Sequence, residues 1–213
     1  MDTTLSPPRR LVARHSVRLF PRSHSGRAAA LRLSSRAGVL ALFCAGFLLA
    51  SLNLHAANVT WSSAGNVTAG GNGNWTGGST WWNGTSGVAW TSGDNATFSA
   101  AGNTTVNSTI TAGTLTFTNS SANMSIIDGA GSLTVNSGIT ATNSANTTAL
   151  TYTISESSLV LGASQTWTVN NGGSVGTANL AVSSVISGSG FGITNAGNGT
   201  LTLTGNNTFS GSA

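Results

Sequence analysis

The sequence predicts an all-β fold, a right-handed parallel β-helix that begins with a Trp- and Gly-rich cap and follows a signal peptide. Short strands that alternate apolar and hydroxyl-bearing residues recur from Thr104 to the end of the chain. Glycine and asparagine separate these strands, as tight corners require. After residue 57, no segment has the helical period of about 3.6 residues. An antiparallel β-sandwich, whose strands would be spaced similarly, is the alternative fold.

The first segment, residues 1–56, has the organisation of an arginine-rich leader followed by a secretory signal peptide. All eight basic residues of the chain are arginines that precede Ala37. An uncharged apolar run follows over residues 37–52 and ends in Asn53-Leu54-His55-Ala56-Ala57, whose small residues suit cleavage after Ala56 or Ala57. The run is shorter than the ~20 residues of a membrane-spanning helix. We therefore expect export, with either an extended signal region or a start codon downstream of Met1.

Most of the charge lies in this leader. The eight arginines and Asp2 give residues 1–57 a formal charge of +7, and the remainder carries −3, which together make the net +4 of the chain. The mature chain has no His, Cys, Lys or Arg. This composition excludes a Ser-His-Asp triad, a cysteine nucleophile, a lysine Schiff base and a zinc site of the usual ligands. Without cations to meet phosphate, the chain is not expected to bind nucleic acid.

Glycoside hydrolysis needs only two carboxylates, and the mature chain has Asp94, Asp128 and Glu156. Asp94 and Asp128 lie in turn-like sequences beside glycines, whereas Glu156 lies among serines, where we expect it to be solvated. These positions do not suggest a catalytic pair. We therefore predict that the protein is not an enzyme and that it has no catalytic residues, no metal site and no cofactor.

The second segment, residues 57–98, is rich in tryptophan and glycine and is predicted to be the N-terminal cap. It contains Trp61, Trp75, Trp81, Trp82 and Trp90. A stack of coils needs a cap over its first coil, and large apolar side chains provide one. The alternative is a carbohydrate-binding module over residues 61–90, in which Trp75, Trp81, Trp82 and Trp90 stack on sugar rings.

The third segment, residues 99–213, is predicted to be the β-helical repeat region. Strand starts fall at residues 115, 133, 152, 167, 185 and 201, which are 15 to 19 residues apart. Leu, Val, Ile and Phe are expected to point inward, and Thr, Ser and Asn outward. Stacked asparagines at the corners are expected to form side-chain ladders. The mature chain is long enough for some six to eight coils.

The last part of this region, residues 197–211, reads GNGTLTLTGNNTFSG and carries a recognisable motif. Its recurrent positions include Gly199, Leu201, Leu203, Gly205, Asn207, Phe209 and Gly211. The motif resembles the autotransporter-associated β-strand repeat, also called the passenger-associated transport repeat. The resemblance implies a large secreted or surface protein of a Gram-negative bacterium with a β-helical passenger region, and it implies no catalytic residues.

From this resemblance we expect a secreted or surface-exposed passenger protein with a structural or adhesive role, exported to the outer-membrane surface or beyond. The chain is expected to be the N-terminal part of a larger autotransporter-like protein. Its expected partners are the secretion machinery and an extracellular glycan or a host or neighbouring cell surface. The last coil is expected to leave Leu201, Leu203 and Phe209 beside an open sheet edge.

Overall fold

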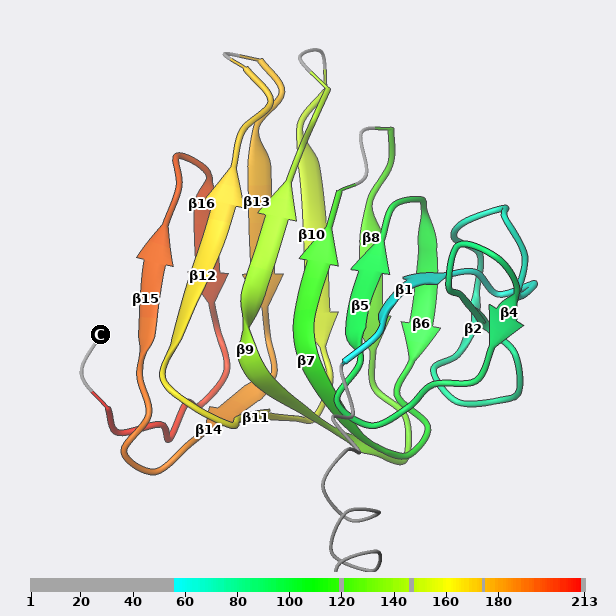
Figure 1. Ribbon diagram of the computed structural model, residues 1–213. Helices are drawn as coiled ribbons and strands as arrows, with labels where there is room; N and C mark the ends of the chain where they lie inside the picture. The colour runs from blue at the N-terminus through cyan, green and yellow to red at the C-terminus, as the bar shows by residue number, and fades with distance from the viewer. Residues whose placement is uncertain (1–55, 119–120, 146–147, 174, 212–213) are drawn as a thin grey trace, which may run out of the picture. The chain divides into compact units, whose positions relative to one another are not determined.

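A computed structural model of the chain describes residues 56–118, 121–145, 148–173 and 175–211. Apart from Ala56, the predicted leader and signal peptide lie outside these residues. Strands and turns make up the described part, which contains no helix long and apolar enough to cross a membrane. The strands form parallel sheets arranged as a β-solenoid, which confirms the predicted β-helix (Figure 1). The antiparallel sandwich is wrong, because consecutive coils pair in parallel.

The back of the solenoid is a parallel sheet of six strands. In spatial order it contains β2 (Gly73–Asn74), β6 (Gly102–Thr105), β8 (Met124–Ile127), β10 (Leu150–Ser155), β13 (Ala178–Val182) and β16 (Thr200–Leu203). We call this sheet the back face. Along β10, buried apolar residues that point inward alternate with half-buried threonines and a serine that point outward.

The second sheet has ten strands and bends at a corner into two further faces. It contains β1 (Asn58–Trp61), β3 (Trp81–Trp82), β4 (Gly87–Val88), β5 (Asn95–Phe98), β7 (Thr109–Phe117), β9 (Ser132–Thr142), β11 (Ser158–Leu161), β12 (Gln165–Asn170), β14 (Val185–Ser187) and β15 (Ile193–Ala196). The long strands β7 and β9 cross the corner. The first part of β9 pairs with β11, and its second part, from Gly138, pairs with β12.

The corner of β7 is a β-bulge between Ala112 and Thr114. A side chain at Gly113 would meet the Asn95 Oδ1 atom at 2.3 Å, so the bulge leaves room for hydrogen only. The face beyond the bend, made of β1, β5, β12, β15 and the second parts of β7 and β9, is called the front face. The strands β11 and β14 with the first parts of β7 and β9 form the lower face (Figure 1).

The coils are fewer and longer than the sequence predicted. The solenoid has about four turns instead of six to eight. The predicted series of strand starts combined strands that lie on different faces. Residues 152 and 201 belong to the back face, whereas residues 133 and 185 belong to the lower face. Residues that pair between parallel strands lie further apart along the chain, from 19 residues for Ala96 and Leu115 to 37 for Thr60 and Thr97.

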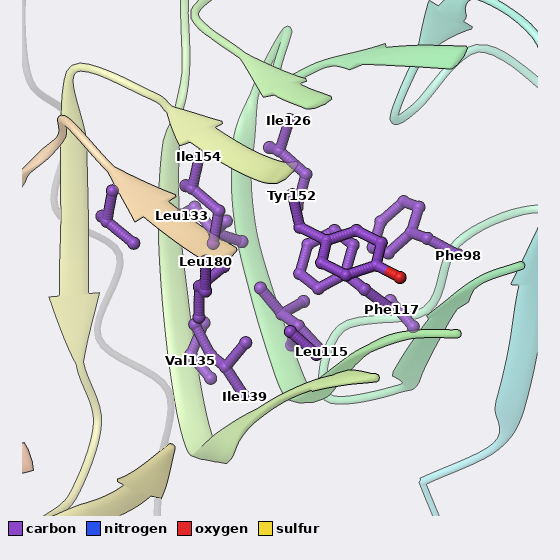
Figure 2. Close-up of a cluster of buried hydrophobic side chains, with 14 of the residues drawn as sticks. Phe98, Leu115, Phe117, Ile126, Leu133, Val135, Ile139, Tyr152, Ile154 and Leu180 are labelled. Carbon is purple, nitrogen blue, oxygen red and sulfur yellow. The ribbon is translucent and has the colours of Figure 1, made fainter. Parts of the chain in front are cut away.

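The core is built from columns of apolar side chains that lie level by level above one another. On the lower face, Leu133 pairs with Leu159 and Leu159 pairs with Ile186, and all three are fully buried. Aromatic rings of the front and back faces meet in the middle, where Phe117 and Tyr152 stack with centroids 5.4 Å apart (Figure 2). The Tyr152 hydroxyl donates to the Thr142 carbonyl at 2.8 Å, and burial raises its pKa to about 12.

Asparagines of adjacent levels are hydrogen-bonded in pairs at two places. The Asn95 side-chain amide donates to the Asn58 Oδ1 atom one level away at 3.0 Å. The Asn171 side chain donates to the Asn198 carbonyl at 2.9 Å, and the Asn198 Oδ1 accepts the Asn171 backbone N–H at 2.8 Å. These amides supply hydrogen bonds where the chain turns away from the sheet, so that backbone groups at the corners are not left unpaired.

Candidate functional site

The N-terminal tryptophans close one end of the core. Trp61, Trp75 and Trp81 are fully buried. The Trp81 ring lies 5.2 Å from Trp61 and 5.1 Å from Trp75, and both Trp75 and Trp81 contact Phe98 of the first regular coil. The short strands β3 and β4 pair antiparallel beyond β1, so the parallel order ends there. This arrangement is the predicted cap.

Hydrogen bonds within the cap occupy two of the indoles. The Trp61 Nε1 atom donates to the Gly71 carbonyl at 2.9 Å, and the Trp81 Nε1 atom donates to the Trp75 carbonyl at 2.9 Å. Trp90 is half-buried, with its ring 5.0 Å from that of Trp75. Of the residues predicted to stack on sugars, Trp75 and Trp81 therefore present no open ring face, and Trp90 is packed against their cluster.

Trp82 is placed differently from the other three. It is half-buried and lies directly opposite Thr60 across the antiparallel pair of β1 and β3. Its neighbour Trp81 faces the core opposite Trp61. Because successive side chains of a strand point to opposite sides, Trp82 and Thr60 lie on the outer side of the front face.

Thr60 is the first residue of a row that crosses five of the six strands of the front face, from β1 to β12. Each member pairs with the next one in adjacent parallel strands. The row, which we call the threonine row, consists of Thr60, Thr97, Thr116, Thr140 and Thr168. Each of these side chains is half-buried on the outer side of its strand. Neighbouring members are separated by the strand spacing of about 4.8 Å.

The surface around this row carries no charge. The six strands of the front face contain no Asp, Glu, Lys or Arg. Each threonine offers a hydroxyl that both donates and accepts, together with a methyl group. Trp82 stands at one end of the row, where its indole adds apolar contact area. The result is a regular, uncharged array suited to a neutral, hydroxyl-rich surface.

The threonine row was not predicted. Alternation along each strand indicates that these threonines point outward, but their alignment depends on coil lengths that vary from 19 residues between Thr97 and Thr116 to 37 between Thr60 and Thr97. No fixed period in the sequence connects them. The only signal available was that each of these threonines lies directly between two buried apolar residues of its strand.

The motif at residues 197–211 forms the last level of the stack. Leu201 and Leu203 lie in β16 and face inward, but both remain half-buried, because no strand covers them among the described residues. Phe209 is also half-buried against the core. These three side chains are therefore only partly exposed at the end of the described stack.

The polar and glycine positions of the motif tie the chain to the level below. The Asn207 Oδ1 atom accepts the Ile186 N–H at 3.0 Å, and the Thr208 N–H donates to the Ile186 carbonyl at 2.8 Å. This segment runs beside β14 without being a regular strand. Side chains at Gly199, Gly205 and Gly211 would meet atoms of that level at 2.6, 1.9 and 2.2 Å.

The three carboxylates of residues 57–213 do not together form a cluster that could hold a metal ion. Asp94 is 5% exposed and accepts the backbone N–H groups of Ala57 and Thr91. Asp128 is exposed and accepts the Ser157 N–H at 3.3 Å. Within the described ranges, no group of three or more His, Cys, Asp or Glu side chains could hold a metal ion.

Glu156 corrects the prediction that it is solvated. Its side chain is fully buried, and neither carboxylate oxygen has a hydrogen-bond partner among the described residues. It continues the inward alternation of Tyr152 and Ile154 past the end of β10. Burial, and secondarily the negative charge of Asp128, raise its pKa to about 7.

Comparisons with known proteins leave the chain without an assigned relative, because no family model, no curated protein and no solved structure matches it. The likeness to the autotransporter-associated repeat therefore depends on residues 197–211 alone. Among the described residues, the threonine row with Trp82 is the most regular surface feature, and it is the candidate functional site.

Proposed function

We propose that this chain is part of an exported, surface-exposed β-helical passenger protein whose front face adheres to an extracellular glycan or cell surface. The observation that carries the proposal is the threonine row, in which five uncharged side chains stand in register along one face. The signal-like leader and the motif at residues 197–211 support export and the passenger class.

The chemistry of the front face suits adhesion more than turnover. Hydroxyls repeated at about 4.8 Å meet a neutral polymer through many weak hydrogen bonds. The overall affinity can be high although each hydrogen bond is weak, because after the first bond has formed the others form within the same complex. The proposed role is thus binding and spacing outside the cell, without catalysis and without a cofactor.

The stacked coils suit the structural half of this role. The middle levels pair with their neighbours through backbone hydrogen bonds on three faces, so this part of the stack extends rigidly along one axis. The cap protects one end from edge-to-edge pairing with other chains. An adhesive face carried on such a stack is held away from the point of attachment.

The test measures adhesion of the full chain, exported from a Gram-negative host, to insoluble neutral polysaccharides and to cell surfaces. Thr116→Lys and Thr140→Lys place bulky charges in the middle of the threonine row and should reduce binding at least tenfold. Thr153→Lys is the matched control, because Thr153 lies on the outer side of the back face. The control should bind like the original chain.

Equal binding by all three variants would contradict the adhesive front face. Trp82→Ala refines the result, since Trp82 is the one member of the predicted sugar-stacking set that lies opposite the row. Loss of glycan binding in this variant alone would show that the glycan contacts the edge of the front face near Trp82 and not the middle of the threonine row. Recovery of the chain only from the cytoplasm, with its leader intact, would contradict the proposed export.

A further inference from the structure

The predicted signal-peptidase site lies against a buried carboxylate. The backbone nitrogen of Ala57 donates to the Asp94 Oδ1 atom at 2.9 Å. Asp94 is 5% exposed, and its other oxygen accepts the Thr91 N–H at 3.1 Å. Ala57 itself is exposed and Ala56 is half-buried, so the peptide bond between them lies at the surface of the folded unit.

Asp94 has no cationic side chain to pair with in the mature chain, since residues 57–213 contain no Lys, Arg or His. A carboxylate that is withdrawn from water is costly unless it is paired or well hydrogen-bonded. In the uncleaved chain its partner at Ala57 is a neutral amide. The one cation that residues 57–213 can supply is a new N-terminus.

We propose that signal peptidase cleaves after Ala56 and that Asp94 binds the α-ammonium group of Ala57, forming an ion pair that exists only in the processed protein. The inference rests on the proposed export. Hydrolysis of the Ala56–Ala57 bond consumes one water, leaves a carboxylate on Ala56 and gives Ala57 an amine. That amine takes up a proton, because the ordinary pKa of an α-amino group is about 7.7–8.0.

The geometry selects Ala57 over Asn58, the other expected N-terminus. The Ala57 carbonyl accepts the Asn95 N–H at 2.8 Å. Both backbone polar groups of Ala57 are therefore hydrogen-bonded, one to Asp94 and the other to Asn95, the first residue of β5. Cleavage after Ala57 would remove the atom that contacts Asp94. Asn58 is committed to the strand pair with Asn95 and would leave Asp94 with the Thr91 amide alone at this position.

Processing therefore stabilises the cap at the moment when the leader is lost. The precursor, which has to stay unfolded for export, lacks the pair, and the mature chain gains it. The pair ties the first residue of the mature chain to the turn before β5. It thereby fixes the edge at which β1 joins the parallel stack.

The absence of lysine allows a direct test, because a chain of residues 57–213 has one reactive amine, its α-amine. Mass spectrometry of the exported chain should find Ala57 as the first residue. Acetylation of the amine removes its charge, whereas reductive dimethylation keeps it. We expect acetylation to lower the melting temperature at neutral pH by about 2–4 °C, a shift typical of one modest interaction in a chain of this size. Dimethylation should lower it less.

Asp94→Asn provides the second arm. In this variant acetylation should change the melting temperature no further, and Asp128→Asn, which removes an exposed carboxylate, should leave the acetylation effect intact. An N-terminus at Asn58, or equal acetylation effects with and without Asp94, would overturn the inference. If the chain is not exported, the proposed function fails separately. The Ala57 terminus is then made with an engineered protease site ahead of it, and the same acetylation pair decides the inference.

Discussion

The ring of Phe98 stacks on the ring of Phe117, its partner in the next parallel strand, with centroids 5.1 Å apart and an interplanar angle of 19°. Phe117 stacks in turn on Tyr152 of the back face (Figure 2). Both phenylalanines are fully buried. The three rings join the cap, which contacts Phe98, to the regular coils.

Replacing Phe117 by Ala should therefore destabilise the whole described unit. Loss of a buried ring with two stacked neighbours should lower the free energy of unfolding by about 3–5 kcal/mol. Phe117→Leu fills much of the space and should cost less. Urea unfolding followed by circular dichroism measures both. Val67→Ala is the control, since Val67 is 78% exposed, and a comparable loss there would contradict the assigned core.

Glu156 should make stability fall as the pH rises. Its carboxyl has a pKa of about 7 in the fold and 4.5 as the ordinary value, so the folded state holds the proton more tightly between these values. The stability that protonated Glu156 contributes is fully present below pH 4.5 and is lost as the pH rises through about 7. The loss is about 3 kcal/mol for a difference of this size.

Glu156→Gln removes this titration and should flatten the pH dependence of unfolding between pH 4.5 and about 7, the range between the ordinary and the raised pKa. The variant should be more stable than the original chain at the alkaline end. Asp128→Asn should weaken the pH dependence without abolishing it, because burial is the larger cause of the shift. An unchanged profile in Glu156→Gln would show that another group is responsible.

Gly205 should tolerate no side chain. A Cβ atom there would lie 1.9 Å from the Ser184 carbonyl oxygen, which belongs to the backbone of the level below. Gly205→Ala should cost about 1–3 kcal/mol or more through displacement of the last coil. Gly77→Ala is matched to it, because the nearest atom there is 3.8 Å away. Equal thermal stability of the two variants would count against the close packing of the last level.

Trp81 and Trp82 should behave as opposites although they are adjacent. Trp81 is fully buried within the cap and donates to the Trp75 carbonyl, so Trp81→Ala should cost about 3–5 kcal/mol. Trp82 lies on the outer side opposite Thr60, so Trp82→Ala should cost about 1 kcal/mol or less. Denaturant unfolding of the two variants would reveal whether this inside–outside alternation is correct.

Much of this arrangement follows from local alternation. Leu201, Leu203 and the inward residues of β10 could be predicted because a strand buries every second side chain. The cap could be predicted because a stack needs an apolar end. Neither inference depends on knowing which coil lies above which.

The features that were missed depend on vertical pairing. The coil count was overestimated because strands of different faces follow one another at similar spacings. The threonine row stayed hidden because Thr60 and Thr97 lie 37 residues apart while Thr97 and Thr116 lie 19 apart. The burial of Glu156 was missed because serines beside it suggested solvent, whereas the inward alternation continues past the strand end.

Unequal coils stacked at an equal spacing have a consequence for how such a chain grows. Each level adds about 4.8 Å whatever the number of residues it contains. Residues can be gained or lost between paired strands, and the pairs 96–115 and 139–167 already differ by 9 residues in their separation along the chain. Such changes alter the length of the loops but not the length of the stack. Reach changes only when a whole level is duplicated or deleted. The distance spanned by such a protein would therefore evolve in fixed steps, while its loops vary freely in length.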